Sequence, residues 1–197
     1  MRREPGRAQR GLVRTLKPSG ELGGRAVFAI RHPMEGHAVT TKNDFSEEEW
    51  ARIVRGPFLA GLSISLADPG GPIEAAKESM AMIKSAVNPP SREQLLAEVA
   101  LELQAQTQQR HNPLKDYKPA KGQPPGKQIL DDLRSVMSTV AARATPEETA
   151  AFGQWLVTTA QAAADAAKDG GFMGFGAKQV SDGEQAMLDQ LREAVTV

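Results

Sequence analysis

The sequence contains one short helix-start signal four times. In each copy a serine or threonine precedes a glutamate or glutamine by three residues, and an apolar run with helical spacing follows. The copies are Ser46 with Glu49, Ser91 with Gln94, Thr145 with Glu148, and Ser181 with Glu184. Such a pair is a capping box, because the hydroxyl accepts from the amide three residues on while the longer side chain reaches back to the cap amide. Helices are therefore expected to begin at about these four places.

Apolar residues after these signals recur at the three- and four-residue spacing of a helix face, which predicts stripes that face a core. The stripes are Ile73, Ala76, Met80, Ile83 and Val87; Leu95, Leu96, Val99 and Leu103; Ile129, Leu133, Val136 and Val140; Phe152, Leu156, Thr159, Ala160, Ala163 and Ala167; and Met187, Leu188, Leu191 and Val195. Two further helical pieces are expected over residues 46–54 and 57–67. The predicted fold is all-α, a compact bundle of about five to seven helices.

Composition agrees with a helical protein and excludes several chemistries. Aromatic residues make up only 5% of the chain, so the core must consist mainly of aliphatic residues and alanine. The chain has no cysteine, which excludes disulfides, thiolate nucleophiles and cysteine-ligated metals. The longest apolar stretch, residues 58–66, is far shorter than the roughly 20 residues of a membrane-spanning helix. A cytoplasmic protein without membrane contact is expected.

The first 43 residues are expected to form a disordered basic arm or an upstream extension. Residues 1–33 hold eight basic and two acidic residues, a net charge of +6, whereas the rest of the chain carries −6. Three interpretations compete: an arm for nucleic acid or acidic partners, an organelle-targeting segment, and a chain whose true start is Met34. Nucleic-acid contact is expected only through this arm, because an acidic body repels phosphate.

Residues 44–197 are expected to form a single helical domain with a proline- and lysine-rich linker at 112–126. This linker is either a functional loop or, as the favoured interpretation, a tether between two helical halves. Lys115, Lys118 and Lys121 lie at every third position around Tyr117. They form a small basic patch that could hold an anionic partner, although solvated linker charge is the favoured interpretation.

No motif predicts a catalytic, cofactor-binding or metal-binding residue. The glycine-rich run that ends at Lys178 does not match a phosphate-binding loop, because Ala177 separates Gly176 from the lysine and Gln179 replaces the hydroxyl residue. The three histidines stand outside any metal-binding pattern. An enzyme is therefore not favoured, and no cofactor is expected.

The alanine-rich segment 160–167 and four aromatic residues are the candidates for an interaction surface. Small side chains allow helices to approach closely, either at the centre of a monomeric bundle or at the seam of a symmetric dimer. The candidate interaction residues are Trp50, Trp155, Phe172 and Phe175, with the two tryptophans expected as anchors at the surface of the alanine-rich helix.

Three sequence segments together resemble a family of small, uncharacterised helical bacterial proteins. They are F-S-E-E-E-W at 45–50, F-x-x-W-L at 152–156, and the G-G-F-x-G-F-G-x-x-x-V-S-x-x-E run at 170–184. The resemblance implies a single helical unit over roughly residues 44–195 and no particular chemistry.

The expected function is non-catalytic protein association, as a homo-oligomer through the alanine-rich helix. The alternative is a small-molecule-binding protein or an atypical enzyme, with a pocket between the helical halves near the Gly170–Gly176 loop.

Overall fold

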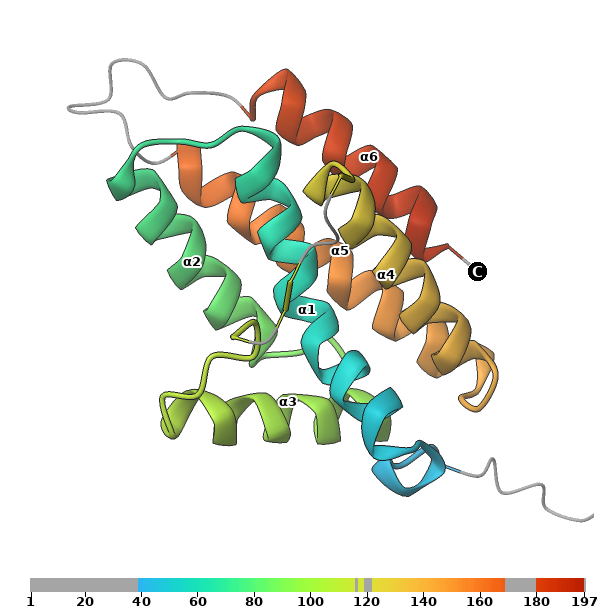
Figure 1. Cartoon of the computed structure of the whole chain (residues 1–197). Helices are drawn as coiled ribbons and strands as arrows, with labels where there is room; N and C mark the ends of the chain where they lie inside the picture. The colour runs from blue at the N-terminus through green and yellow to red at the C-terminus, as the bar shows by residue number, and fades with distance from the viewer. Residues whose placement is uncertain (1–38, 116, 119–121, 169–179, 197) are drawn as a thin grey trace, which may run out of the picture. The chain divides into compact units, whose positions relative to one another are not determined.

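The computed structural model describes residues 39–115, 117–118, 122–168 and 180–196, and this part of the chain is all-α. A 3-10 turn at Lys42–Asp44 precedes six helices (Figure 1). The helices are α1 Glu47–Ala67, α2 Pro72–Ala86, α3 Gln94–Gln108, α4 Pro125–Ala141, α5 Pro146–Lys168 and α6 Asp182–Val195. The predicted helical bundle is confirmed. No helix in these ranges is long and apolar enough to cross a bilayer.

Helix α5 is the centre of the bundle. It contacts α1, α2, α3, α4 and α6, and in Figure 1 it passes behind α1 between α2 and the α4–α6 pair. Ala160, Ala163 and Ala164 are buried in the chain's own core, where their small side chains allow neighbouring helices to come close. Part of the alanine-rich segment therefore packs at the centre of the bundle.

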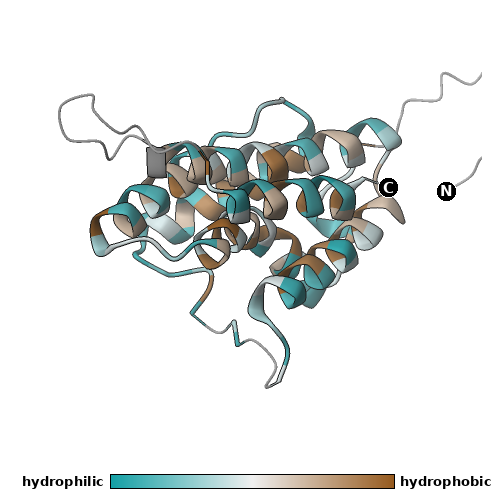
Figure 2. Ribbon diagram, turned by 90° about the horizontal axis from the view of Figure 1, so that it is seen from above, coloured by the Kyte–Doolittle hydropathy of each residue, from teal (hydrophilic) through white to brown (hydrophobic). Residues whose placement is uncertain are grey.

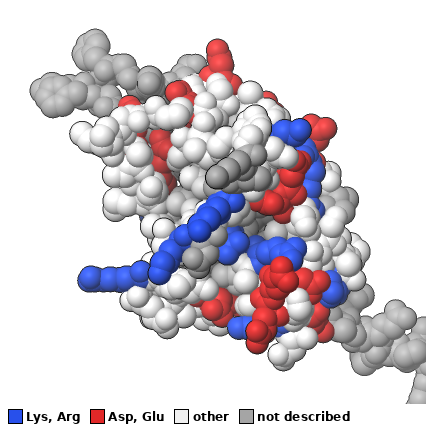
Figure 3. Space-filling view, viewed as in Figure 1, with Lys and Arg blue, Asp and Glu red and all other residues white. Residues whose placement is uncertain are grey.

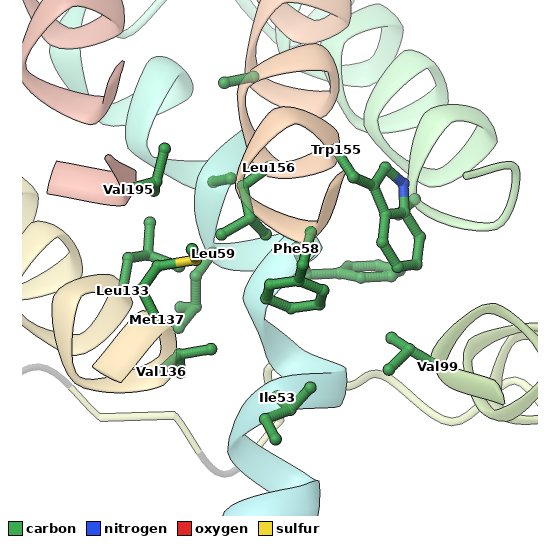
Figure 4. Packing of buried hydrophobic residues seen from close by; sticks show 14 of the residues in the cluster. Ile53, Phe58, Leu59, Val99, Leu133, Val136, Met137, Trp155, Leu156 and Val195 are labelled. Atoms are coloured by element: carbon green, nitrogen blue, oxygen red, sulfur yellow. The ribbon is translucent and has the colours of Figure 1, made fainter. Parts of the chain in front are cut away.

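The core is a single cluster to which all six helices contribute. Apolar positions gather mainly where the helices face one another (Figure 2). In Figure 4, Leu59 of α1 lies beside Val136 and Met137 of α4, and Phe58 of α1 lies close to Leu156 of α5. Trp155 stacks edge-on against Phe152 with ring centroids 6.0 Å apart. Its Nε1 donates to the Ser85 carbonyl of α2 over 3.1 Å, so the indole N–H has a hydrogen-bond partner inside the core.

Three of the four predicted capping boxes are confirmed. Ser46, Thr145 and Ser181 each accept a hydrogen bond from the amide of the glutamate three residues on, over 3.1–3.2 Å. Each glutamate accepts from the amide of its hydroxyl partner in return.

The prediction of a fourth capping box, at Ser91, is wrong. Helix α3 begins at Gln94 with Glu93 as its N-cap, and Ser91 Oγ accepts instead from the Glu93 amide over 3.2 Å. A serine can bond to the backbone two residues ahead in a turn, and this local bond competes with helix capping.

The two short helices predicted at 46–54 and 57–67 are one continuous helix with Pro57 inside it. Proline removes a backbone hydrogen bond and usually breaks a helix at a cost of about 3 kcal/mol. Here Pro57 is buried, and Phe58, Leu59 and Ala60 immediately after it lie in the core. Burial of these side chains offsets the lost backbone bond.

The predicted core stripe of α2 is wrong in its first half. Ile73 and Met80 are 74% and 73% exposed, and Ala76 is exposed between them. The buried positions of α2 are Glu78 and Ala86. The spacing of apolar residues does not predict this orientation, because the inward side chain is a carboxylate. The Ser65 hydroxyl donates a hydrogen bond to Glu78 over 2.5 Å, which compensates for burial of this polar group.

The packed part of the chain begins ahead of residue 44, the predicted boundary of the helical domain. Thr40 is buried, its Oγ1 donates to Glu148 Oε2 over 2.6 Å, and its amide donates to Oε1 over 3.3 Å. These bonds attach the segment before α1 to the first turn of α5. The remainder of the predicted basic arm, residues 1–38, lies outside the described residues.

The described part of the connection between α3 and α4 lies against the helices. Leu114 and Tyr117 pack on the core, and Arg55 Nε of α1 donates to the Pro113 carbonyl over 3.2 Å. Helix α1 contacts both α3 and α4, so the helices on the two sides of the connection share one body.

Candidate functional site

A groove of about 960 Å³ lies between α4, α5 and α6 in the described part of the chain and is called here the α5 groove. Its apolar lining includes Ala141 of α4; Ala150, Gly153, Val157 and Ala162 of α5; and Val195 of α6. Gln154, Gln161, Asp165 and Arg192 add polar side chains. From Thr149 to Asp165, α5 lines it over about 24 Å at the 1.5 Å rise of a helix. A long, apolar depression of this kind has the shape that receives a helix.

Small side chains explain why the groove exists. Ala150, Gly153 and Val157 follow one face of α5 at helical spacing, and all three line the groove. A methyl group at Gly153 would lie 2.9 Å from the Val195 carbonyl oxygen, so the end of α6 sits directly on this glycine. Thr149, at one end of the groove, is 7% exposed, and its Oγ1 has no hydrogen-bond partner in the described structure.

The outer face of α2 is the clearest apolar surface among the described helices. Ile73, Ala76 and Met80 lie at i, i+3 and i+7, so they line one side of the helix, and all three are exposed. Helix α2 has 15 residues and is therefore about 22 Å long, close to the length of the α5 groove.

Another hollow among the described residues, of about 360 Å³, is bounded by α1, α4 and the connection between α3 and α4, and it is called here the basic hollow. Its charged lining consists of Arg52 and Arg55 of α1, Lys118 of the connection, and Asp132 of α4. Figure 3 shows Lys and Arg side chains gathered in the middle of this face, where the connection crosses α1. Arg52 is also paired with Glu48 over 2.6 Å, so Arg55 and Lys118 are the cations of the lining that have no carboxylate at ion-pair distance among the described residues. Two such cations favour an anion.

Tyr117 and Asp132 form the polar wall of the basic hollow. The Tyr117 hydroxyl donates to Asp132 Oδ2 over 2.8 Å. Burial, together with the hydrogen bond and the negative charge of Asp132, holds the pKa of Tyr117 well above its usual range, while the positive charge of Arg55 opposes this shift. The phenol is therefore a neutral hydrogen-bond donor at physiological pH.

The two tryptophans among the predicted interaction residues are buried within this chain. Trp155 is fully buried and Trp50 is 4% exposed, so both indoles lie in the core rather than at the surface of the alanine-rich helix. Trp50 packs 6.0 Å from Phe45 between ring centroids, under the ammonium of Lys42. Phe172, Phe175 and the Gly170–Gly176 loop, where the alternative pocket was predicted, lie outside the described residues.

Part of the predicted basic patch is present in the basic hollow. Tyr117 and Lys118 line it, whereas Lys115 does not and Lys121 lies outside the described ranges. Sequence reasoning missed Arg52 and Arg55, which come from more than 60 positions earlier in the chain. Their spacing of three residues puts them on one helix face, but nothing in the sequence indicates that this face meets Tyr117.

Metal ligands do not cluster in the described parts of the chain: no group of three His, Asp or Glu side chains is placed to hold an ion. Comparisons of the sequence and the fold with protein-family models, curated proteins and solved structures found no match. The resemblance to small bacterial helical proteins stays a prediction.

Proposed function

We propose that this protein acts by self-association, with the outer face of α2 of one copy lying in the α5 groove of the next. A single observation carries the proposal: the described part of the chain presents an apolar helix face, exposed at Ile73 and Met80, and an apolar groove of about the same length. The groove is lined by alanine, glycine and valine, so the longer Ile73 and Met80 side chains can enter it. Their inner neighbours Glu78 and Ala86 stay packed in the same chain.

Burial of the α2 face supplies a driving force. Removing an exposed isoleucine or methionine side chain from water contributes about 1.5–3 kcal/mol each, before the entropy cost of association is subtracted. Ile73 and Met80 are both about three-quarters exposed, so most of this gain is available to a partner. The exposed polar residues at the groove, such as Gln154 and Arg192, would form the rim of the contact.

This contact differs from the symmetric dimer seam expected from the alanine-rich sequence. It joins two different surfaces, so each copy can receive one neighbour and contact another. A contact of this type closes into a ring if the rotation between copies allows it, and otherwise grows as a chain.

Two surface substitutions test the two halves of the contact. Met80→Glu places a charge on the α2 face, and Ala150→Arg fills the groove from an exposed position of α5. We expect the unmodified protein to form species larger than its 21.1 kDa chain as concentration rises, and each variant to stay monomeric in sedimentation velocity. Leu101→Glu is the matched control, because Leu101 is 64% exposed on α3, outside both surfaces. An unmodified protein that stays monomeric throughout would overturn the proposal.

Mixing the two variants tests the pairing itself. Met80→Glu keeps an intact groove and Ala150→Arg keeps an intact α2 face, so together they should form a 1:1 complex of 42.2 kDa, twice the chain mass, that grows no further. Two monomeric variants that fail to combine would contradict the pairing of α2 with the groove and favour a symmetric contact instead. Circular dichroism of each variant checks that it is folded.

A further inference from the structure

We propose that the basic hollow is a binding site for a small oxyanion, the phosphate or carboxylate group of a low-molecular-weight ligand. The proposal is independent of self-association, because the hollow shares no residue with the α5 groove or with the outer face of α2.

Arg55 is a positioned, half-buried cation. Its Nε donates to the Pro113 carbonyl over 3.2 Å, which fixes the plane of the guanidinium. In the described structure no carboxylate lies within ion-pair distance of Arg55, whereas Arg52, Arg134, Arg143 and Arg192 each have one. A partly buried cation is costly without an opposite charge. The guanidinium fork also matches the geometry of phosphate and carboxylate oxygens.

The other lining groups complete a site for an oxyanion. Arg52 lies one helical turn from Arg55 on the same face of α1, and Lys118 brings a third cation from the opposite wall. Ser135 of α4 adds a hydroxyl that can donate. Asp132, the one carboxylate of the lining, already accepts the Tyr117 hydrogen bond at Oδ2.

The volume of the hollow sets the size of the ligand. About 360 Å³ lies at the lower end of the range of small-molecule pockets, roughly 300–1,000 Å³. Leu59 and Val136 form its apolar floor, so a ligand with a short carbon skeleton behind its anionic group would be accommodated. The small volume and the few cations of the lining fit a small anion rather than a large polyanion.

The test is calorimetric titration of the full chain with inorganic phosphate and, separately, with succinate, at constant ionic strength. We expect saturable 1:1 binding of at least one anion. Binding of phosphate only identifies a phosphate ligand, and binding of succinate only identifies a carboxylate ligand. No saturable binding of either would overturn the proposal.

Matched variants locate the binding. Arg55→Met should weaken the affinity by about tenfold or more, the effect of losing a charged hydrogen-bond donor. Arg52→Met and Lys118→Met should each weaken it by a smaller factor. Arg134→Met is the control for Arg52→Met, because each arginine makes an exposed ion pair within its own helix, over 2.7 and 2.6 Å. Lys127→Met, at an exposed position outside the hollow, is the control for Lys118→Met.

Equal weakening by the control variants would overturn the site, because it would show only general attraction to surface charge. Since Arg55 also holds Pro113, Arg55→Met could loosen the connection. Lys118→Met carries the test in that case: Lys118 is exposed and no bond of the fold depends on it among the described residues. An unchanged affinity in a folded Lys118→Met protein, together with an unchanged affinity in Arg52→Met, would also overturn the proposal.

Discussion

Tyr117 and Asp132 join the connection between α3 and α4 to the body of the bundle through one hydrogen bond of 2.8 Å. The pair stands at the edge of the core, where Tyr117 is half-buried and packs against apolar side chains. Tyr117 is the only tyrosine of the chain, so this single contact has its own optical signal.

The tyrosinate absorbance of the folded protein should appear at higher pH than that of free tyrosine. Burial is the largest cause of the raised pKa, and Asp132 adds a hydrogen bond and a negative charge. Asp132→Asn should therefore lower the pKa of Tyr117 but leave it above its usual value of 10.0. Asp131→Asn, which changes an exposed carboxylate on the same helix, is the control. A Tyr117 pKa that does not respond to Asp132→Asn would contradict this account.

The same shift predicts how stability changes in alkali. Above pH 10 the unfolded chain loses its tyrosine proton while the folded chain keeps it, so the unfolded state binds fewer protons and unfolding is favoured. The contribution of Tyr117 is fully present below pH 10 and is lost as the pH rises through the folded-state pKa. Urea unfolding at several alkaline pH values should show a smaller loss of stability in Tyr117→Phe than in the unmodified protein.

Two glycines of the helices should respond oppositely to alanine. At Gly153 the new methyl group would meet the Val195 carbonyl oxygen at 2.9 Å and Met137 Cε at 3.2 Å, so Gly153→Ala should destabilise the protein by about 1–3 kcal/mol. At Gly56 the nearest atom is Leu156 Cδ2 at 3.4 Å, an ordinary contact. Gly56→Ala should therefore be neutral or stabilising by up to about 1 kcal/mol, the helix preference of alanine. Thermal and urea unfolding of both variants measure the difference, and similar losses at the two sites would contradict it.

Removing the charge of Glu148 should detach the segment before α1. Its carboxylate is buried and accepts from the Thr40 amide, the Thr40 hydroxyl and the Thr145 amide. Glu148→Gln replaces one acceptor oxygen by a donor, and we expect a loss of about 1–3 kcal/mol in unfolding free energy. Faster hydrogen exchange at the Thr40 amide should accompany it. Glu147→Gln, at the exposed neighbouring position, should change neither quantity.

Helix starts could be predicted from sequence where the deciding chemistry is local. Ser46, Thr145 and Ser181 each bond to a residue three positions away, so the relevant atoms are all visible in a short window. Ser91 presents the same pattern but bonds to Glu93, because a turn two residues long competes for the same hydroxyl.

The orientation of α2 and the continuity of α1 depend on contacts that a short window does not contain. Glu78 faces inward, where the hydroxyl of Ser65, 13 residues earlier, donates a hydrogen bond to its carboxylate. Pro57 stays helical because the residues around it are buried by other helices.

The α5 groove and the basic hollow were harder to predict from the sequence, because each combines residues from several elements. The basic hollow needs Arg55 and Tyr117, 62 positions apart, to meet across one face of the bundle. The α5 groove is lined by small side chains such as Ala150 and Gly153. A sequence shows that these residues are small, but it does not show whether a neighbouring helix fills the space beside them.

The central position of α5 has a consequence for synthesis of the chain. Helices α1 to α4 leave the ribosome first, yet the helix that they all contact is complete only at residue 168. At about 5–20 residues per second, on the order of 5–20 s pass between completion of α1 and completion of α5. During that interval Ile53, Phe58 and their apolar neighbours on α1 lack the part of their packing that α5 supplies. Newly made chains are therefore expected to need chaperone protection most between these two points.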